Sequence, residues 1–462
     1  MTMSHKISFH ISNTNGLFTS SPQLHLNPLD GKKLNIDDNS RITIKIGNKT
    51  AAAIVHFNSD EPEGSAAVEP ALYQSLLLPI QTYKWHVLYD VHDQLLKLGP
   101  FISILTEFKH AGHDQPSFGS IHCFAEELQT FISKEGGLLS IMNLSDNMNL
   151  GEESKGFIFY DDAWIMWDLP EPDVIYNRIH SRKTERTKAY LVFYEHYLQS
   201  GSTIFNPQFL SKWEVYQLLG AESHMNPFIP ETNLYSESTF DDFLGKYGAV
   251  YIKPVHGSLG RGIIEVTKHS DGLFIVNQTY FPEQKEHTFE SLTDVKNAVH
   301  KWIGKRICII QQALSLLEKD GRKIDFRLLT HPDAGHHWRV TSAVARISGE
   351  NQFVSNLAQG GVLDKPGAVL KGFFSTSTSS QILSLMKELA LETAALIAKS
   401  LEGVTGELGL DIGVDLDGKI WLIEANSKPS KKQEGTSSGI RPSTKAIWKF
   451  SKTLWLERRD SP

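Results

Sequence analysis

Residues 251–266 form a glycine-rich segment whose composition suits phosphate binding. Lys253 stands at the end of an apolar run, and three glycines follow within six positions, at Gly257, Gly260 and Gly262. Glycine lets backbone N–H groups approach an anion closely, and a lysine at a strand end adds a fixed positive charge. A second apolar strand follows instead of a helix, which excludes a Walker A loop and a dinucleotide fingerprint. The segment therefore predicts a clamp on nucleotide phosphates, and an ordinary glycine-rich hairpin is the alternative.

Residues 409–426 carry acidic and amide side chains at positions suited to holding a metal ion. The sequence predicts two strands joined by a tight Asp-Gly turn. In this hairpin Asp411 lies opposite Glu424 and Asn426, so three oxygen ligands converge. Mg²⁺ takes one or two carboxylates together with substrate phosphates and water. The hairpin therefore predicts an Mg²⁺ site with space for a nucleotide, and a solvated surface hairpin is the alternative.

Basic side chains at predicted strand ends form a third group, at Lys323, Arg327 and Arg346. Arginine can hold a phosphate or a developing acyl phosphate through two parallel hydrogen bonds, a role for which it is better shaped than lysine. An arginine on a strand is also often a surface residue whose stem lies along apolar side chains. These residues therefore count toward a phosphate site only together with the glycine-rich segment and the acidic hairpin.

The elements that must position these residues differ along the chain. Short alternating runs such as residues 41–46 predict a small β-rich N-terminal domain. An apolar strand at residues 101–105, followed by a helix that ends at Gly136, predicts a parallel α/β domain. The remainder reads as an α+β pair of lobes that carry the chemistry-bearing residues. The predicted boundaries are, in chain order, residues 1–90, 91–205, 206–315 and 316–462.

Two helices are predicted in the last two regions. Asn206 as N-cap and Pro207 as the first helical residue predict a helix directly after the α/β domain. Its apolar stripe consists of Phe209, Trp213, Tyr216 and Leu219. Residues 443–459 predict an amphipathic C-terminal helix. Its apolar face is expected to pack on the protein's own core, and a partner-binding tail is the alternative.

Composition and charge exclude several classes of function. The chain has 46 basic and 53 acidic residues, and its formal net charge of −7 disfavours a nucleic-acid partner. Cys123 and Cys308 do not stand at metal-ligand spacing, so neither a disulfide framework nor a zinc site is expected. The N-terminus alternates polar and apolar residues, so neither a secretory signal nor a membrane span is expected. We therefore expect a soluble protein that is cytoplasmic when synthesised.

Taken in chain order, these segments resemble the ATP-grasp superfamily from about residue 206 onward. The resemblance implies an ATP-grasp fold behind a pre-ATP-grasp α/β domain, with ATP and Mg²⁺ as cofactors and Mn²⁺ as an alternative ion. The nucleotide contacts that it implies are Lys212, Lys253, Gly257, Ser258, Gly260, Arg261, Gly262 and Asn356. Backbone groups that it implies for the adenine belong to Gln311, Gln312, Ala313 and Leu314. The metal ligands that it implies are Asp411, Glu424 and Asn426.

The segments around Arg327, Arg346 and Asn356 resemble the corresponding run in ligases that add glutamate to a protein or peptide. By this resemblance, Lys253 and Arg327 offset charge on the transferred phosphoryl group, and Arg346 lies near the acyl phosphate. The run departs from those ligases at Val354, where they often carry arginine. It therefore does not by itself imply an acidic acceptor.

Over about residues 95–430 the likeness narrows to the YheC/YheD group, described as endospore coat-associated proteins. The segments that carry it are residues 99–106, 172–178 and 212–216 and the glycine-rich segment. The ATP-grasp resemblance implies a ligase in which ATP phosphorylates an unidentified carboxylate, and an amine or a similar nucleophile such as a thiol attacks the acyl phosphate. Spore coat proteins are candidate partners, and the endospore coat is a candidate final location. A structural or nucleotide-sensing coat protein without catalysis is the alternative.

Overall fold

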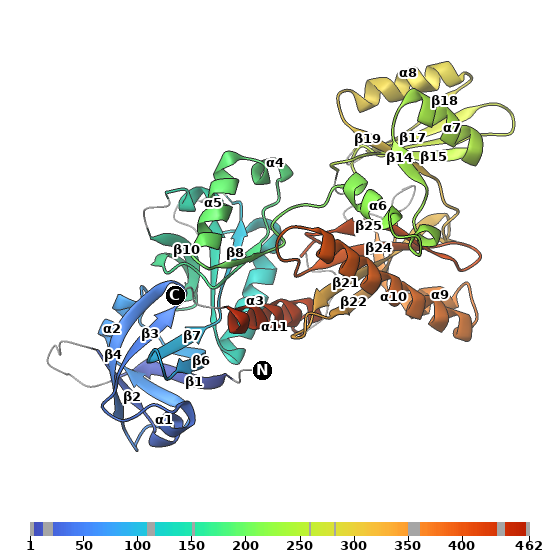
Figure 1. Cartoon of the computed structure of the whole chain (residues 1–462). Coiled ribbons are helices and arrows are strands. Elements are labelled where there is room, and N and C mark those ends of the chain that lie inside the picture. Colours follow the sequence, from blue (N-terminus) through green and yellow to red (C-terminus); the bar gives the residue numbers. More distant parts are fainter. Residues whose placement is uncertain are drawn as a thin grey trace.

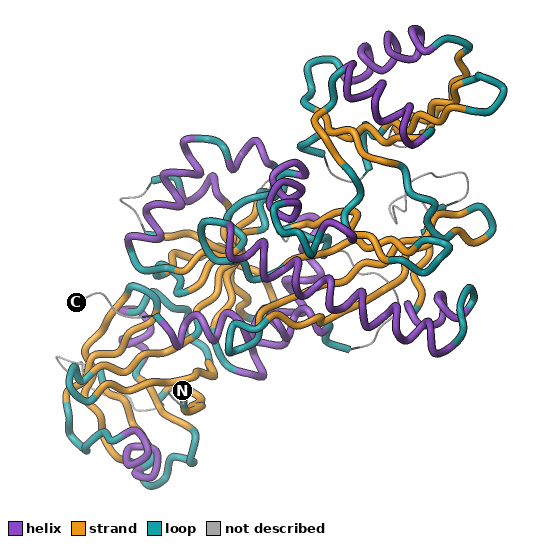
Figure 2. The backbone as a smooth tube through the Cα atoms, turned by 45° about the vertical axis from the view of Figure 1, so that its right-hand side comes forward, coloured by secondary structure: helices purple, strands orange, loops and turns teal. Residues whose placement is uncertain are grey.

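The computed structural model describes residues 4–12, 22–108, 116–149, 153–257, 260–280, 283–349, 361–431 and 439–458. Its strands form one closed barrel and three open sheets within these ranges. Figures 1 and 2 show the barrel at one end of the molecule, a mixed sheet with its helices beside it, and two further lobes toward the other end. Among the described helices, none is long and apolar enough to cross a membrane.

The N-terminal strands close into a barrel because β1 pairs with both β5 and β6. Strand β3 (Arg41–Ile46) buries every second side chain, as expected for a sheet that faces a core on one side. The other elements are β1 (His5–Ile11), β2 (Gln23–Leu26), α1 (Pro28–Leu34), β4 (Lys49–Phe57), β5 (Ser65–Val68), α2 (Pro70–Ser75), β6 (Tyr83–Asp90) and β7 (Leu95–Gly99). The barrel thus extends to Gly99, past the boundary predicted at residue 90.

The next sheet, here called the β8–β13 unit, has the order β11-β10-β9-β8-β12-β13. Strands β9, β8, β12 and β13 run parallel, as predicted. Every residue of β8 (Phe101–Thr106) is buried, because α3 and the C-terminal helix α11 (Pro442–Glu457) pack on one face of the sheet and α5 packs on the other. The remaining elements are α3 (His122–Glu135), β9 (Leu138–Asn143), β10 (Ser154–Tyr160), β11 (Ala163–Leu169), β12 (Val174–Asn177), α4 (Arg182–Glu185), α5 (Lys188–Gln199) and β13 (Thr203–Phe205).

The third sheet, the β14–β19 lobe, is antiparallel with the order β14-β19-β15-β16-β17-β18. Strands β15 (Ala249–Pro254) and β16 (Ile264–Lys268) pair on either side of the glycine-rich segment, so this segment joins two strands as predicted. Helices α7 (Glu237–Tyr247) and α8 (Leu292–Ile303) share its apolar core. The other strands are β14 (Thr232–Leu234), β17 (Phe274–Tyr280), β18 (Glu283–Phe289) and β19 (Cys308–Gln312).

The fourth sheet, the β20–β25 lobe, packs against the long helix α10 (Thr376–Ser400). The predicted acidic hairpin is present as β24 (Leu408–Val414) and β25 (Ile420–Asn426). Gly418, with φ 82°, lies in its turn. The remaining elements are β20 (Glu318–Lys319), β21 (Arg322–Pro332), β22 (Trp338–Ile347), β23 (Val362–Asp364) and α9 (Pro366–Lys371). Helix α6 (Lys212–Gly220) lies between this lobe and the β14–β19 lobe (Figure 1).

The helix predicted to start at Asn206 instead starts at Lys212, with Ser211 as its N-cap, so that prediction is wrong. Asn206 has a left-handed backbone with φ 54°. Its side-chain nitrogen donates to the carbonyl of Glu407 at 2.8 Å, and its side-chain oxygen accepts from the N–H of Gly406 at 2.7 Å. Polar groups that would start a helix are therefore used to hold the linker against the β20–β25 lobe.

Helix α11 (Pro442–Glu457) returns from the end of the described chain to the β8–β13 unit. Ile447, Phe450 and Leu454 are buried in the same apolar cluster as Ile102 and Ile104 of β8. The prediction that this helix packs on the protein's own core is confirmed. Only its predicted end at residue 459 lies outside the described residues.

Candidate nucleotide and metal site

A cavity lies where α6, the β14–β19 lobe and β25 meet. Small-molecule sites commonly mix apolar walls with a few polar groups. The lining residues are Lys212, Val215, Tyr216, Leu219, Ile229, Pro230, Thr232, Lys253, Ile309, Gln311, Leu422, Ile423, Glu424 and Ala425. Four residues predicted from sequence, Lys212, Lys253, Gln311 and Glu424, thus line one cavity.

Lys253, at the end of β15, is fixed by the neighbouring strand β19. Its Nζ donates to Gln311 Oε1 at 2.5 Å, and Gln311 Nε2 donates to Thr232 Oγ1 at 2.9 Å. Burial lowers the pKa of Lys253 to about 8, although Glu424 partly offsets this effect and Lys212 adds to it. The ammonium is therefore charged at neutral pH and loses its charge in mildly basic solution.

Lys212, the first residue of α6, links the glycine-rich segment to the acidic hairpin. Its Nζ donates to Glu424 Oε1 at 2.8 Å and to the carbonyl of Gly257 at 3.1 Å. The side chains of Lys212 and Glu424 are 14% and 26% exposed. Because both groups reach solvent, a ligand can separate the pair without leaving a deeply buried charge unpaired.

The described end of the glycine-rich segment is held by Thr279 of β17. Its Oγ1 donates to the carbonyl of Gly260 at 2.7 Å. Gly260 and Gly262 have φ values of 68° and 70°, in the left-handed region that favours glycine. Arg261 lies between them, and Ser258 lies outside the described residues. These two glycines are therefore required by the turn itself, in addition to any contact with phosphate.

The run from Gln311 to Leu314 forms backbone hydrogen bonds within the protein. The N–H groups of Gln312 and Ala313 donate to main-chain carbonyls at 3.0 and 3.2 Å. Gln311 lines the cavity, whereas the other three residues are not among its described lining residues. These two N–H groups are therefore already paired, and the adenine contact predicted for the backbone groups of residues 311–314 stays a prediction.

The acidic hairpin brings the predicted metal ligands toward one another. Asp411 pairs with Glu424 across the hairpin, and Asn426 lies two positions further along β25. The register shifts beside this pair, so Ile423 is an extra residue in β25. Such a bulge re-aims neighbouring side chains. Ile423 and Glu424 accordingly both line the cavity, although they are adjacent in the strand.

Asp411 is buried and pairs with both predicted catalytic arginines. Arg327 donates to its two carboxylate oxygens, with Nη2 at 2.9 Å from Oδ2. Arg346 Nη2 lies 3.0 Å from Oδ2 and also donates to Asp325 at 2.5 Å. Burial opposes ionisation of Asp411, but the charges of the two arginines outweigh it and hold the pKa of this carboxyl below its ordinary value. In this structure the charges of Arg327 and Arg346 are thus offset by carboxylates, one of which, Asp411, is itself a predicted metal ligand.

The site offers few side chains that could hold a metal ion without a nucleotide. Within the described ranges, no group of three or more His, Cys, Asp or Glu side chains has an arrangement that could hold one. Mg²⁺, however, needs only one or two carboxylates when phosphates and water complete its shell. The oxygen donors of Glu424, Asp411 and Asn426 therefore fit an ion that arrives with a nucleotide. Asn356, the remaining predicted nucleotide contact, lies outside the described residues.

Charged groups from α4 and from the residue after it approach the site, and the sequence analysis missed them. Arg182 lies over the ring of Phe209 at 4.7 Å, and its charge interacts with that of Glu424. Arg186 Nη2 donates at 3.0 Å to Nε2 of His256, which precedes the glycine-rich turn. These groups belong to the β8–β13 unit and not to the lobes that form the cavity, so spacing along the chain does not link them to the site.

The apolar wall of the cavity carries a signal that was present in the sequence. Val215, Tyr216 and Leu219 follow Lys212 at helical spacing, so all four lie on one face of α6. On β19, Ile309 and Gln311 alternate with residues that face the other side of the sheet. Helical and strand periodicity, anchored on the predicted polar residues, would have identified this wall.

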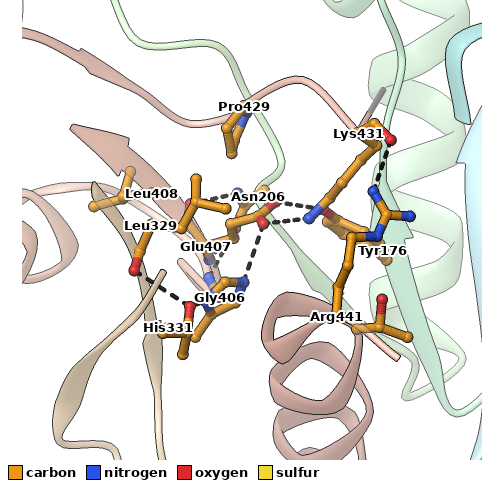
Figure 3. A network of polar contacts seen from close by, with 12 residues as sticks. Tyr176, Asn206, Leu329, His331, Gly406, Glu407, Leu408, Pro429, Lys431 and Arg441 are labelled. Carbon is orange, nitrogen blue, oxygen red and sulfur yellow. Dashed lines mark hydrogen bonds and ion pairs between the residues drawn. The ribbon is translucent and has the colours of Figure 1, made fainter. Parts of the chain in front are cut away.

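A buried ionic network anchors the chain that follows β25 (Figure 3). Glu407, which is fully buried, accepts a hydrogen bond from Tyr176 Oη at 2.5 Å. His331 Nε2 lies 3.0 Å from its other oxygen, and Lys431 forms an ion pair with it. The network joins β12, β21 and the segment after β25. It therefore holds the strand that carries Glu424 against the β8–β13 unit.

Comparison with known proteins gives consistent matches. A model of the YheC/D-like ATP-grasp family matches residues 201–454. The chain is 29% identical over 380 residues to the endospore coat-associated protein YheD of Bacillus subtilis (strain 168), covering 80% of each chain. It is 26% identical over 276 residues to the endospore coat-associated protein YheC of the same organism, covering 58% of this chain and 74% of YheC.

Among solved structures, the chain is similar to D-cycloserine synthetase DcsG, with 12% identity and a TM-score of 0.46 over 76% of this chain and 99% of that chain. It is also similar to the D-Ala:D-Ser ligase VanG of Enterococcus faecalis, with 10% identity and a TM-score of 0.43 over 77% and 97%. The family match spans more than half of the chain and confirms the fold and the resemblance predicted from sequence. The chain therefore belongs to the YheC/D-like ATP-grasp family.

Proposed function

We propose that this protein is an ATP-dependent ligase that joins a carboxylate to an amine, or to a thiol, and that it acts in endospore coat formation. The proposal rests on the convergence of Lys212, Lys253 and Glu424 on one cavity between two lobes. Two cations beside a partly exposed carboxylate suit the phosphates of ATP together with Mg²⁺. The description of two relatives as endospore coat-associated supports the biological part of the proposal.

In the proposed reaction, a carboxylate oxygen of the substrate attacks the γ-phosphorus of ATP, the bond to the ADP oxygen breaks, and ADP leaves. An amine then attacks the acyl carbon of the acyl phosphate, the carbon–oxygen bond to phosphate breaks, and the amine proton passes to solvent. Inorganic phosphate and an amide are the products. No side chain acts as a nucleophile, so catalysis rests on positioning and electrostatics.

Each charged residue has a place in this scheme. Lys212 and Lys253 hold the phosphates, because both reach the cavity with a positive charge. Mg²⁺ held by Glu424, with Asp411 and Asn426, would offset charge on the phosphates. Arg327 and Arg346, which pair with carboxylates in the free protein, would stabilise negative charge that develops during transfer.

A structural or nucleotide-sensing coat protein is the second candidate. Its support is the pairing of Asp411 with two arginines, because a carboxylate neutralised in this way has less free charge for a metal ion. A sensor of this kind would bind Mg-ATP without turnover. A purely structural protein would bind none.

The deciding experiment measures phosphate release from Mg-ATP by the purified protein. Pools of amino acids, peptidoglycan fragments and small peptides are added in turn. Glu424→Gln removes a carboxylate that lines the cavity and is expected to lower the rate about 10²- to 10³-fold, by analogy with the loss of one transition-state contact. Asp417→Asn removes the same charge from the exposed turn of the same hairpin and is the matched control.

Turnover that depends on one pool, is lost in Glu424→Gln and is kept in Asp417→Asn would establish the ligase. Tight Mg-ATP binding without turnover in any pool would favour the sensor. Absence of Mg-ATP binding would contradict both candidates that use the nucleotide cavity.

A further inference from the structure

An arginine from the β8–β13 unit reaches the linker that leads into α6. Arg182, the first residue of α4, is half-buried, and its Nη1 donates to the carbonyl of Leu210 at 2.5 Å. Its guanidinium lies 4.7 Å from the centroid of the Phe209 ring. A carbonyl group and an aromatic face therefore hold this side chain in place without neutralising its charge.

The charge of Arg182 is not paired with a carboxylate in the described part of the chain. Glu185, on the same short helix, forms an ion pair with Lys428 instead. Glu107 accepts hydrogen bonds from Thr184 and from the N-cap of α4. A guanidinium has five N–H donors, and Arg182 uses one of them within the described ranges. The remaining donors suit an anionic ligand, above all one with phosphate oxygens.

Arg182 acts on the same carboxylate as Lys212. Burial lowers the pKa of Arg182, and among the neighbouring charges that of Glu424 opposes this effect most strongly, ahead of Glu185 and Glu214. Lys212 Nζ lies 2.8 Å from Glu424 Oε1. Glu424 is a predicted Mg²⁺ ligand, and Mg²⁺ is bound together with substrate phosphates. A phosphate drawn to Mg²⁺ on this carboxylate would therefore meet both cations.

The direction of α6 indicates which phosphate comes nearest to Arg182. Tyr216 and Leu219 belong to the apolar wall of the cavity, which suits a nucleotide base. Lys212 begins the helix, about 10 Å from Leu219 along its axis. Leu210, to which Arg182 donates, precedes Lys212 at the same end. A nucleotide with its base on the wall and its phosphates at Lys212 therefore directs its last phosphate toward Arg182.

A second contact joins the same segment to the glycine-rich turn. Arg186, the residue after α4, donates at 3.0 Å to Nε2 of His256. The carbonyl of the next residue, Gly257, accepts from Lys212 at 3.1 Å. Residues 182–186 therefore contact both the linker into α6 and the glycine-rich segment, the two parts of the chain that flank the predicted phosphate position.

We propose that Arg182 binds the γ-phosphate of ATP, and that the β8–β13 unit thereby distinguishes ATP from ADP in the nucleotide cavity. ADP lacks this phosphate, so it keeps the contacts with Lys212 and Lys253 and loses the contact with Arg182. During transfer, Arg182 stabilises negative charge on the phosphoryl group. The proposal rests on the nucleotide binding proposed above, but it depends neither on the identity of the substrates nor on turnover.

Isothermal titration calorimetry on the full-length protein compares Mg-ADP with the Mg²⁺ complex of a non-hydrolysable ATP analogue that has a β,γ-imido bridge. Arg182→Gln is expected to raise the Kd for the ATP analogue at least about tenfold and to leave the Kd for ADP unchanged, because only the γ-phosphate loses a charged hydrogen-bond partner. Arg182→Lys keeps the charge without the planar fork and should give an intermediate Kd for the analogue. Lys183→Gln removes the same charge from the exposed next residue of α4 and should leave both Kd values unchanged.

A second measurement separates a lost contact from a change in folding. Thermal melting confirms that each variant is folded, and millimolar guanidinium added to Arg182→Ala is expected to restore affinity for the ATP analogue without changing the affinity for ADP. Equal losses for the two nucleotides in Arg182→Gln, or no loss for the analogue, would overturn the proposal. So would an equal loss in Lys183→Gln. These results leave nucleotide binding intact, whereas a wild-type protein that binds neither nucleotide would overturn both this proposal and the function on which it rests.

Discussion

Lys253 is the residue through which pH is expected to act on nucleotide binding. Its pKa is lowered to about 8 by burial, against an ordinary value of 10.5. The charged form that attracts phosphate is therefore present below pH 8 and is lost as the pH rises above it. The affinity for Mg-ATP should fall by up to about tenfold per pH unit above pH 8. Isothermal titration calorimetry between neutral and mildly basic pH measures this slope.

Lys253→Arg supplies the comparison for this prediction. Arginine keeps its charge throughout the range, so its affinity for Mg-ATP should not change with pH. Lys305→Arg, at an exposed position, should retain the wild-type slope. If the affinity for Mg-ATP has the same slope against pH in the wild-type protein, Lys253→Arg and Lys305→Arg, then Lys253 is not the group that titrates.

At the scale of residues, the sequence predicted the parts of the site that follow from local pattern. Lys253 is the last residue but one of β15, before the glycine-rich segment, and Glu424 lies two residues before the end of β25. At both positions, spacing along the chain alone indicates that the side chain meets a ligand. The pairing of Asp411 with Arg327 could not be predicted in this way, because the two residues are 84 positions apart and meet only through the register of β21 and β24. That register depends on the packing of the whole sheet.

At the scale of elements, Asn206 fixes the path of the linker between the β8–β13 unit and α6. The sequence predicted a helix N-cap, since Asn followed by Pro is a common helix start. The amides of Gly406 and Glu407 and the carbonyl of Glu407 need partners, and the Asn206 side chain supplies an acceptor to the two amides and a donor to the carbonyl. This tertiary demand outweighs the local capping preference.

Asn206→Ala is expected to destabilise the protein by about 2–4 kcal/mol, through lost buried hydrogen bonds and a left-handed backbone without glycine or asparagine. Asn206→Gly should recover about 1 kcal/mol of this loss, because only the backbone strain is removed. Asn39, which also has positive φ but is exposed, gives the control: Asn39→Ala should cost only about 1 kcal/mol. Urea unfolding measures all three, and equal losses at both positions would contradict a role for the buried hydrogen bonds.

At the scale of the whole molecule, Glu407 joins the β8–β13 unit to the β20–β25 lobe. Glu407→Gln leaves Lys431 buried without its counter-charge and should cost about 3–5 kcal/mol in urea unfolding. Glu457→Gln breaks a pair with His336 in which both side chains are 50% exposed, and it should cost less than about 1 kcal/mol. Similar losses in both variants would show that the junction does not depend on this network.

The same network should make the protein sensitive to acid. Burial opposes ionisation of Glu407, but the charge of Lys431 and the hydrogen bond from His331 outweigh it and hold the pKa of this carboxyl well below its ordinary value of 4.5. The stability that it contributes is therefore complete above pH 4.5 and is lost as the pH falls below that value. Glu407→Gln should show a shallower loss of stability on acidification than the wild-type protein. A parallel loss in both would assign the acid sensitivity to other carboxylates.

The packing of α11 has a consequence for the order in which the chain folds as it leaves the ribosome. The last strand of the barrel ends at Gly99, so the barrel can fold while the rest of the chain is still being made. The β8–β13 unit follows immediately, yet its apolar cluster includes Ile447 and Phe450. The core of the β8–β13 unit therefore stays incomplete, with apolar side chains exposed to solvent, until both later lobes have been synthesised and α11 has left the ribosome.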